Sequence, residues 1–123
     1  MSNSIKFFST NLTAPDVSFK QALLKGQAPD KGLYLPEEIP LINPKEISEF
    51  SQMEYYQIAF EVARRFLVGQ ISDEDLLAIV KDAYDYEVPL EHVYDKKYVM
   101  RLDQGPTASF KDFAARMMGR LMQ

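Results

Sequence analysis

The sequence predicts an α+β fold, in which a helix-rich N-terminal part is followed by one strand, one loop and one helix. Capping residues followed by apolar residues at helical spacing recur up to about residue 84. Beyond Pro89, residues 95–103 are typical of a strand, and an amphipathic segment over 109–121 follows after a short loop. This last unit has the character of the first half of a βαβ unit.

The first elements are short and are bounded by turn and capping residues. Residues 5–10 predict a short strand. Ser18 is a suitable N-cap for a helix over 18–25, and Gly26 stands where a helix commonly ends. Residues 33–35 predict an extended piece between a turn and a proline.

Three further helices are predicted, each behind a capping pair: Asn43 with Glu46, Ser51 with Glu54, and Ser72 with Asp75. The second of them is expected over 53–68. The apolar residues of the second and third helices are spaced to form one buried face, namely Tyr56, Ala59, Phe60, Ala63, Phe66, Leu67, Leu76, Leu77, Val80 and Tyr84.

The composition narrows the class of protein. Hydrophobic residues make up 46% and charged residues 26%, as in ordinary globular domains, and the net charge of −4 argues against a nucleic-acid partner. The absence of cysteine excludes disulfides and thiolate metal sites, and a single histidine, His92, gives no support to a metal site. With no apolar run long enough to span a bilayer and no secretory signal at the start, we expect a cytoplasmic protein without a membrane partner.

The last helix carries a lysine in its first turn. Ser109 and Asp112 form a capping pattern that places Lys111 at the second helical position. The positive end of a helix destabilises an ammonium group, and the neutral amine is the form that Schiff-base chemistry needs. An ordinary surface lysine can also occupy this position, because the unfavourable interaction with the helix dipole costs only about 0.3–1 kcal/mol of stability. The residues alone leave both interpretations open, and Phe113, Met117 and Leu121 are expected to face the core.

Two motifs in the chain resemble one enzyme family. The stretch GPTASFKD, residues 105–112, resembles the lysine motif of threonine synthases, which are pyridoxal-phosphate (PLP) enzymes of fold type II. The stretches FFSTN and APDKGLYLPEEIP, residues 7–11 and 28–40, are similar to the opening of the same family. The pattern is broken at three positions, Asn11, Lys31 and Gln104.

The resemblance covers nearly the whole chain and implies its organisation. Residues 1–95 are expected to form the N-terminal domain of the family, and residues 96–123 to begin the fold-type II catalytic domain. The chain is therefore expected to be a truncated, N-terminal fragment of a longer enzyme.

The resemblance also implies an activity. Threonine synthases are lyases of threonine biosynthesis that convert O-phospho-L-homoserine and water to L-threonine and phosphate by PLP-dependent β,γ-replacement. Lys111 would be the catalytic residue, would bind PLP covalently and would move protons during turnover. Thr107 and Ser109 are candidate substrate-binding residues, or caps of the loop. Lys6, Lys31 and Arg101 are available to bind the substrate phosphate, and the sequence does not select among them.

The fragment itself is expected to be inactive and to lack bound PLP. Its five glycines are isolated, so none of them forms the glycine-rich loop that cradles a cofactor phosphate. Apolar residues left exposed near the C-terminal helix would favour self-association: Met100, Leu102, Phe113, Met117 and Leu121. Two alternatives remain at this point, another fold-type II lyase or dehydratase, and a non-catalytic helical interaction module.

Overall fold

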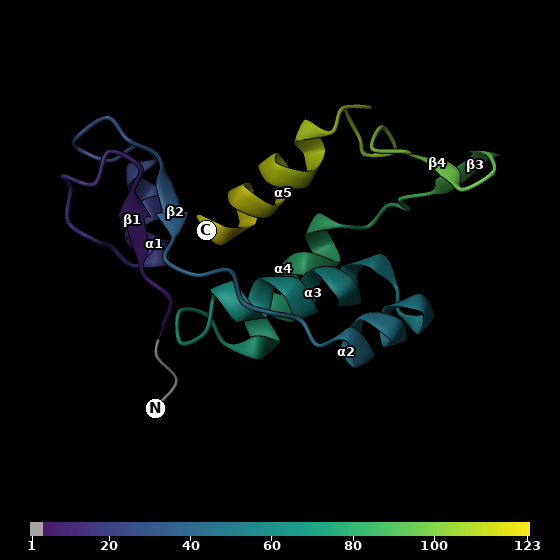
Figure 1. The fold of residues 1–123 in the computed structure, drawn as a ribbon, viewed down its shortest axis with the longest axis horizontal. Helices are drawn as coiled ribbons and strands as arrows, with labels where there is room; N and C mark the ends of the chain where they lie inside the picture. The colour runs from purple at the N-terminus through teal and green to yellow at the C-terminus, as the bar shows by residue number, and fades with distance from the viewer. Residues whose placement is uncertain (1–3) are drawn as a thin grey trace.

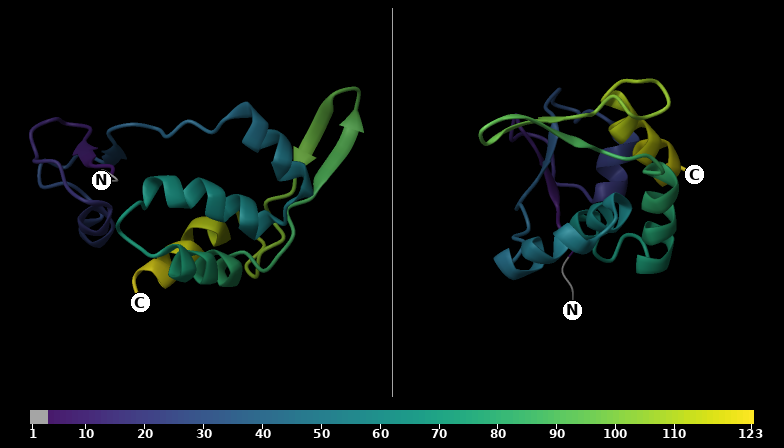
Figure 2. Two further views of the ribbon diagram at one scale, coloured as in Figure 1. Left: turned by 90° about the horizontal axis from the view of Figure 1, so that it is seen from below. Right: turned by 90° about the vertical axis from the view of Figure 1, so that its right-hand side faces the viewer.

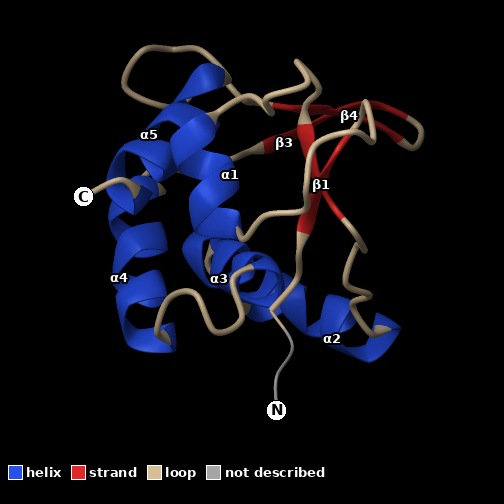
Figure 3. Ribbon diagram, turned by 90° about the vertical axis from the view of Figure 1, so that its left-hand side faces the viewer, coloured by secondary structure: helices blue, strands red, loops and turns tan. Residues whose placement is uncertain are grey.

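The computed structural model describes residues 4–123, so the first three residues of the predicted N-terminal domain lie outside the described part. It is a small α+β structure (Figure 1), and helices make up most of its regular elements (Figure 3). In chain order the elements are β1 (Phe7–Ser9), α1 (Phe19–Lys25), β2 (Tyr34–Pro36), α2 (Pro44–Glu49), the 3-10 helix η1 (Phe50–Gln52), α3 (Tyr55–Phe66), α4 (Asp73–Ala83), β3 (Leu90–Tyr94), β4 (Lys97–Met100) and α5 (Lys111–Leu121).

A small lobe is formed by β1, β2 and α1. The two strands pair antiparallel, with Phe7 opposite Pro36 and Ser9 opposite Tyr34. Its hydrophobic core is formed by Ile5, Phe7, Val17 and Ala22. The predicted caps of α1 are confirmed, since Ser18 Oγ accepts a hydrogen bond from the Gln21 backbone at 3.3 Å and Gly26 ends the helix with φ of 70°.

The loops of this lobe are held together by the carboxylate of Asp30. It accepts hydrogen bonds from Ser9 Oγ at 2.6 Å, from the backbone N–H groups of Thr13 and Ala14 at 3.1 and 2.8 Å, and from that of Gly32 at 3.0 Å. These bonds, the one from Ser9 first, hold the pKa of Asp30 well below its ordinary value. The ionised carboxylate therefore replaces regular secondary structure as the organiser of this region.

The main core lies where α3, α4 and α5 meet. Leu67, Leu76 and Val80 are buried there, and Met117 and Leu121 of α5 pack against them, as their helical spacing predicts. The expected burial of Leu77 is wrong, because its side chain is 40% exposed. The face of α4 that packs against its neighbours contains Leu76 and Val80, and Leu77 lies about 100° around the helix from Leu76.

The start of α3 also differs from the prediction. The expected capping box of Ser51 with Glu54 does not form, and residues 50–52 make a 3-10 turn. The N-cap is Glu54, whose backbone N–H donates to Gln57 Oε1 at 2.8 Å. The capping box is thus shifted by three residues, because Glu54 and Gln57 satisfy the same spacing rule as the predicted pair.

The predicted strand over 95–103 is shorter and has a partner that sequence reasoning missed. β4 pairs antiparallel with β3, with Leu90 opposite Met100, and the hairpin projects away from the helices (Figure 2). Every residue from 90 to 100 is exposed. Because neither face of β3 is buried, its sequence needs no alternation of apolar and polar residues, which is the pattern that identifies a strand. Residue 95 lies in the hairpin turn, and the domain boundary near it stays a prediction.

Two neighbouring leucines of α4 give a matched test of the core. Leu76 is 1% exposed and Leu77 is 40% exposed. We expect Leu76→Ala to lower the free energy of unfolding by about 2–5 kcal/mol, because it removes buried methyl groups and leaves a cavity. Leu77→Ala, which makes the same change in helix propensity, should cost about 1 kcal/mol or less. Urea unfolding followed by circular dichroism measures both, and equal losses would contradict this core.

Candidate functional site

The lysine motif forms a tight turn that leads into α5. The Ala108 N–H donates to the Gly105 carbonyl at 3.0 Å, which closes the turn, and Pro106 occupies the second position, where proline is favoured. Ala108 has φ of 53°, a left-handed conformation that is uncommon for alanine. The chain thus reverses direction within four residues before the helix begins.

Asp112 joins this turn to the helix. Its carboxylate accepts from the Thr107 backbone N–H at 2.9 Å and from Thr107 Oγ1 at 2.7 Å, and its side chain is almost fully buried. These two bonds, the side-chain one first, hold the pKa of Asp112 below its ordinary value. The Thr107 hydroxyl proton is consequently used within the loop, and its oxygen remains available only as an acceptor.

The predicted capping box of Ser109 with Asp112 is therefore wrong. α5 begins one residue later than expected, with Phe110 as its N-cap and Lys111 as its first helical residue. Ser109 Oγ accepts from the Lys111 backbone N–H at a long 3.4 Å, and the Asp112 N–H donates to the Ser109 carbonyl at 3.0 Å. The physical reason is that the Asp112 carboxylate accepts hydrogen bonds from both the backbone N–H and the hydroxyl of Thr107. It is therefore not available to accept from the Ser109 backbone N–H, as the capping box requires.

Gly105 leaves the space that Asp112 needs. A Cβ added at Gly105 would lie 2.8 Å from Asp112 Cβ and 2.9 Å from Asp112 Cγ, closer than real carbon atoms approach. The glycine, the threonine and the aspartate of the motif are thus explained by one arrangement, in which the turn folds over the carboxylate.

Lys111 is exposed at the end of this arrangement. Within residues 4–123 its ammonium group makes no hydrogen bond or ion pair, so the amine is not engaged by neighbouring side chains. The backbone on both sides of it is fixed, by the turn before and by Asp112 after. An accessible amine carried on a fixed backbone can serve covalent carbonyl chemistry.

An aromatic cluster anchors the first turn of α5 to the helices beneath it. The Phe113 ring contacts the rings of Tyr55, Tyr84 and Tyr86, with centroids 6.0, 6.1 and 5.4 Å away. Tyr84 Oη donates to the Phe113 carbonyl at 3.1 Å. Burial, and then the neighbouring tyrosines, raise the pKa of Tyr84 to about 12. Sequence reasoning had assigned Phe113 to the core, and the structure confirms that position.

Tyr86 is the member of this cluster with an unused polar group. Its hydroxyl is buried and has no hydrogen-bond partner among residues 4–123. Burial, followed by the negative charge of Asp112, raises the pKa of Tyr86. Sequence reasoning did not select Tyr86, because a tyrosine between Asp85 and Glu87 gives no pattern that points to the lysine loop.

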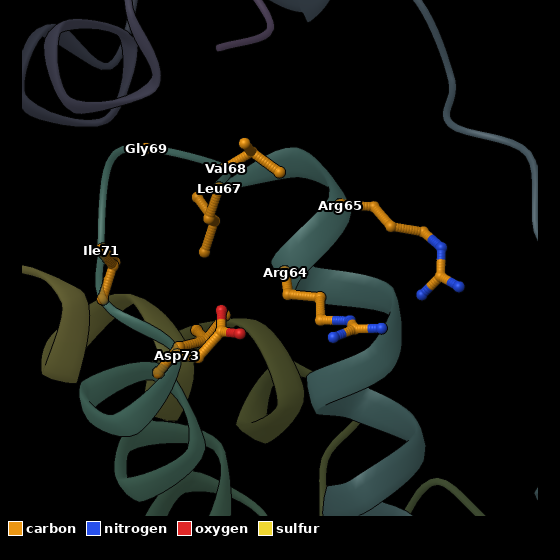
Figure 4. Close-up of a pocket in the computed structure, with 8 residues that line it drawn as sticks. Arg64, Arg65, Leu67, Val68, Gly69, Ile71 and Asp73 are labelled. Atoms are coloured by element: carbon orange, nitrogen blue, oxygen red, sulfur yellow. The ribbon is translucent and has the colours of Figure 1, made fainter. Parts of the chain in front are cut away.

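Two hollows elsewhere in the structure do not include the lysine. One, of about 560 Å³, is lined by Tyr55, Tyr84 and Tyr86 among others. Another, of about 420 Å³, lies at the turn between α3 and α4, where the Arg64 and Arg65 side chains point away from Asp73 (Figure 4). These arginines are already paired with carboxylates, so the second hollow does not offer a free cationic site: Arg64 with Glu61 at 3.0 Å, and Arg65 with Glu46 at 3.0 Å and Glu61 at 3.2 Å.

No group of three or more histidine, aspartate or glutamate side chains is placed to hold a metal ion within residues 4–123. In the same residues, no helix has the length and apolar character needed to cross a membrane.

Comparison with known proteins assigns the family. A family model described as the threonine synthase N terminus matches residues 6–84. The chain belongs to the threonine synthase family. Threonine synthase of Pseudomonas aeruginosa is 37% identical over 123 residues, covering 96% of this chain and 26% of that protein. Threonine synthase of Schizosaccharomyces pombe is 33% identical and covers 100% of this chain. The chain thus spans about a quarter of the length of these relatives.

Solved threonine synthases share this fold. A crystal structure of PLP-bound threonine synthase from Brucella melitensis superposes with a TM-score of 0.92 at 35% identity, covering 97% of this chain and 27% of that one. Threonine synthase of Escherichia coli superposes with a TM-score of 0.89 at 27% identity, covering 95% of this chain and 27% of that one.

The three residues that depart from the family pattern each have a defined conformation or hydrogen bond. Lys31, at a position where the pattern has glycine, adopts φ of 68°, so this turn needs the left-handed conformation that glycine adopts most easily. Asn11 Nδ2 donates to the Asp30 carbonyl at 2.9 Å and so joins the loops of the small lobe. Gln104 Nε2 donates to Asp103 Oδ1 at 3.1 Å.

One of the cations considered for substrate phosphate is already engaged. Arg101 forms ion pairs with Glu91 at 2.5 Å and with Asp103 at 2.7 Å. Its hydrogen bonds, the ones to Asp103 first, raise its pKa further above its ordinary value. Arg101 therefore links β3 to the segment that follows β4. A phosphate would have to compete with two carboxylates for its guanidinium group.

Substitution by alanine should change the free energy of unfolding in opposite directions at two glycines. Gly105→Ala should lower the free energy of unfolding by about 1–3 kcal/mol, because its methyl group overlaps Asp112. Gly119→Ala, on α5 with open space around it, should raise the free energy of unfolding by roughly 0.5–1 kcal/mol through helix propensity. Thermal or urea unfolding checks both, and a neutral Gly105→Ala would refute the close approach.

The bond between Thr107 and Asp112 predicts a pH dependence. In an unfolded chain the pKa of aspartate is about 3.9. Because the folded-state pKa of Asp112 is lower, its ionised form adds stability above about pH 4, and this contribution is lost as the pH falls below that value. We therefore expect the stability difference between wild type and Asp112→Asn to shrink between pH 7 and pH 3. The stability difference between wild type and Thr107→Val should also shrink over this range. Differences that stay constant from pH 7 to pH 3 would contradict the assignment.

Proposed function

We propose that the chain is the N-terminal part of a threonine synthase in which Lys111 binds PLP covalently. The enzyme would convert O-phospho-L-homoserine and water to L-threonine and phosphate. The family assignment supports this activity, and so does the PLP-bound state of the Brucella melitensis relative. The observation that carries the proposal is the position of Lys111, an exposed amine without a partner in the described residues, held by the turn from Gly105 to Asp112.

The residues present fit the attachment of PLP through Lys111. Imine formation needs an amine that a carbonyl group can reach, and the Lys111 side chain is exposed at the start of α5. When bound, PLP supplies an electron sink for carbanions of the substrate. The cofactor phosphate also needs a cradle of backbone N–H groups, and the five isolated glycines of this chain do not provide a glycine-rich loop for it.

Each motif residue takes a separate role in this proposal. Lys111 Nζ would hold the cofactor covalently and would accept and return protons at the substrate carbons. Asp112 and Thr107 fix the loop. Ser109 remains a candidate substrate contact, because its hydroxyl proton has no acceptor within residues 4–123. The acceptor oxygen of Thr107 is the only part of that side chain left for substrate.

The proposed organisation follows the same division. Residues 1–95 would be the N-terminal domain of the enzyme, and residues 96–123 would begin its fold-type II catalytic domain. Because the phosphate cradle is not among these residues, we propose that residues 1–123 on their own neither retain PLP tightly nor turn over substrate.

The protein encoded by the whole reading frame tests this function. With added PLP, wild type should release phosphate from O-phospho-L-homoserine, and Lys111→Ala should release none above background, because the covalent anchor is lost. Lys45→Ala, an exposed lysine on α2, is the control and should keep wild-type activity. An active Lys111→Ala, or a wild type that acts only on serine or threonine, would refute the proposal.

A further inference from the structure

Arg116 is the residue of α5 that binds the end of α4. Its Nε donates to the Ala83 carbonyl at 2.7 Å, and its Nη2 donates to the Asp82 carbonyl at 2.8 Å and to Asp85 Oδ1 at 2.7 Å. The last carbonyls of a helix lack partners within that helix and carry partial negative charge. One guanidinium group therefore satisfies the C-terminus of α4 from a neighbouring helix.

The same guanidinium group reaches the aromatic cluster. Its central carbon lies 5.8 Å from the centroid of the Tyr86 ring, and that ring contacts Phe113, two residues after Lys111. The Arg116 side chain is only 20% exposed. Its contacts are therefore more strongly defined than those of an exposed ion pair, because the planar group is bound on its edge and covered on its face.

The helical positions of Arg116 and Lys111 connect this contact to the proposed site. Five residues separate them, which is about 7.5 Å along the helix and roughly 140° around it. Arg116 thus faces α4 while Lys111 faces the opposite side, in agreement with the exposure of Lys111. A roll of α5 by about 10° would move a group at a radius of about 6 Å by about 1 Å. A displacement of that size in a reacting group can lower a rate by about 100-fold.

We propose that Arg116 is a positioning residue for Lys111. By binding the carbonyls at the end of α4, it fixes the rotation of α5 and thereby the place of the Lys111 amine. This inference rests on the proposed function, and it assigns to Arg116 a task that the lysine motif itself does not contain. Arg116 acts through α5 and does not itself touch the cofactor or the substrate.

Arg120 provides a matched control one turn further along the same helix. It binds the Asp82 carboxylate and the Arg116 carbonyl, and it makes no bond to a backbone carbonyl of α4. Asp82 is 71% exposed, and such pairs contribute little at a protein surface. Replacing Arg120 thus removes the same charge from the same helix without releasing the end of α4.

The experiment compares Arg116→Met, Arg116→Lys and Arg120→Met in the protein encoded by the whole reading frame, loaded with PLP. We expect Arg116→Met to lower kcat per bound PLP by roughly 10- to 100-fold with KM within about twofold, because the amine is displaced while substrate contacts remain. Arg116→Lys should lose nearly as much, since one ammonium group does not reproduce the planar fork. Arg120→Met should stay within about twofold of wild type.

A second readout does not depend on the substrate. Borohydride trapping followed by peptide mass spectrometry measures how fast PLP becomes attached to Lys111, and this rate should fall in both Arg116 variants and not in Arg120→Met. If Arg116→Met does not fold, Arg116→Lys carries the test by the same two measurements. Lower melting temperatures with unchanged kcat per bound PLP and unchanged trapping would overturn the positioning role and leave only a structural one.

The two proposals fail in different ways. If PLP is not trapped on Lys111 in wild type, the proposed function is wrong. If wild type is trapped and active while the Arg116 and Arg120 variants behave alike, the function stands and the inference about Arg116 is wrong.

Discussion

The carboxylate of Asp112 is the constraint on which the lysine loop depends. It is nearly buried and accepts two hydrogen bonds from Thr107, so the ionised carboxylate stabilises the closed turn. Gly105 has no side chain because the carboxylate occupies that space. The same device organises the small lobe, where Asp30 binds Ser9 and three backbone N–H groups. In both places an aspartate supplies the acceptors that a sheet or helix would otherwise supply.

The remaining contacts of α5 explain why the lysine faces outward. Phe113 packs among three tyrosines, Arg116 binds the end of α4, and Met117 and Leu121 join the core. Phe113, Arg116 and Met117 lie about 120–160° around the helix from Lys111, on the side that packs against the rest of the structure. An exposed amine at this position is therefore a consequence of packing on the other side. The N-terminal helices hold α5 in place, and within residues 4–123 none of their side chains forms a hydrogen bond or ion pair with the Lys111 amine.

The sequence predicted what depends on local spacing and missed what depends on distant partners. The helices, the caps Ser18, Asn43 and Ser72, and the core residues Leu76 and Val80 follow from patterns a few residues long. The pairing of Asp112 with Thr107 does not, because Ser109 is also near in sequence and the spacing pattern favours it, whereas the carboxylate accepts two hydrogen bonds from Thr107. The partners of Arg116 lie 31 to 34 residues away in the chain, so no local sequence pattern predicts these contacts.

The hairpin of β3 and β4 is another element that local sequence patterns did not predict. A two-stranded sheet is at best marginally stable when water surrounds both faces, and here every residue from 90 to 100 is exposed. Besides its backbone ladder and the contact between the His92 and Tyr98 rings, the hairpin has an ionic link, in which Arg101 joins Glu91 of β3 to Asp103 beyond β4. Because Asp103 is two residues before Gly105, this ion pair also fixes where the lysine loop begins. The loop is thus bounded by two carboxylates, Asp103 at its entry and Asp112 at its exit, and each is held by a defined donor. If Lys111 binds PLP as proposed, fixing both ends of its loop would present the amine to the cofactor in one geometry.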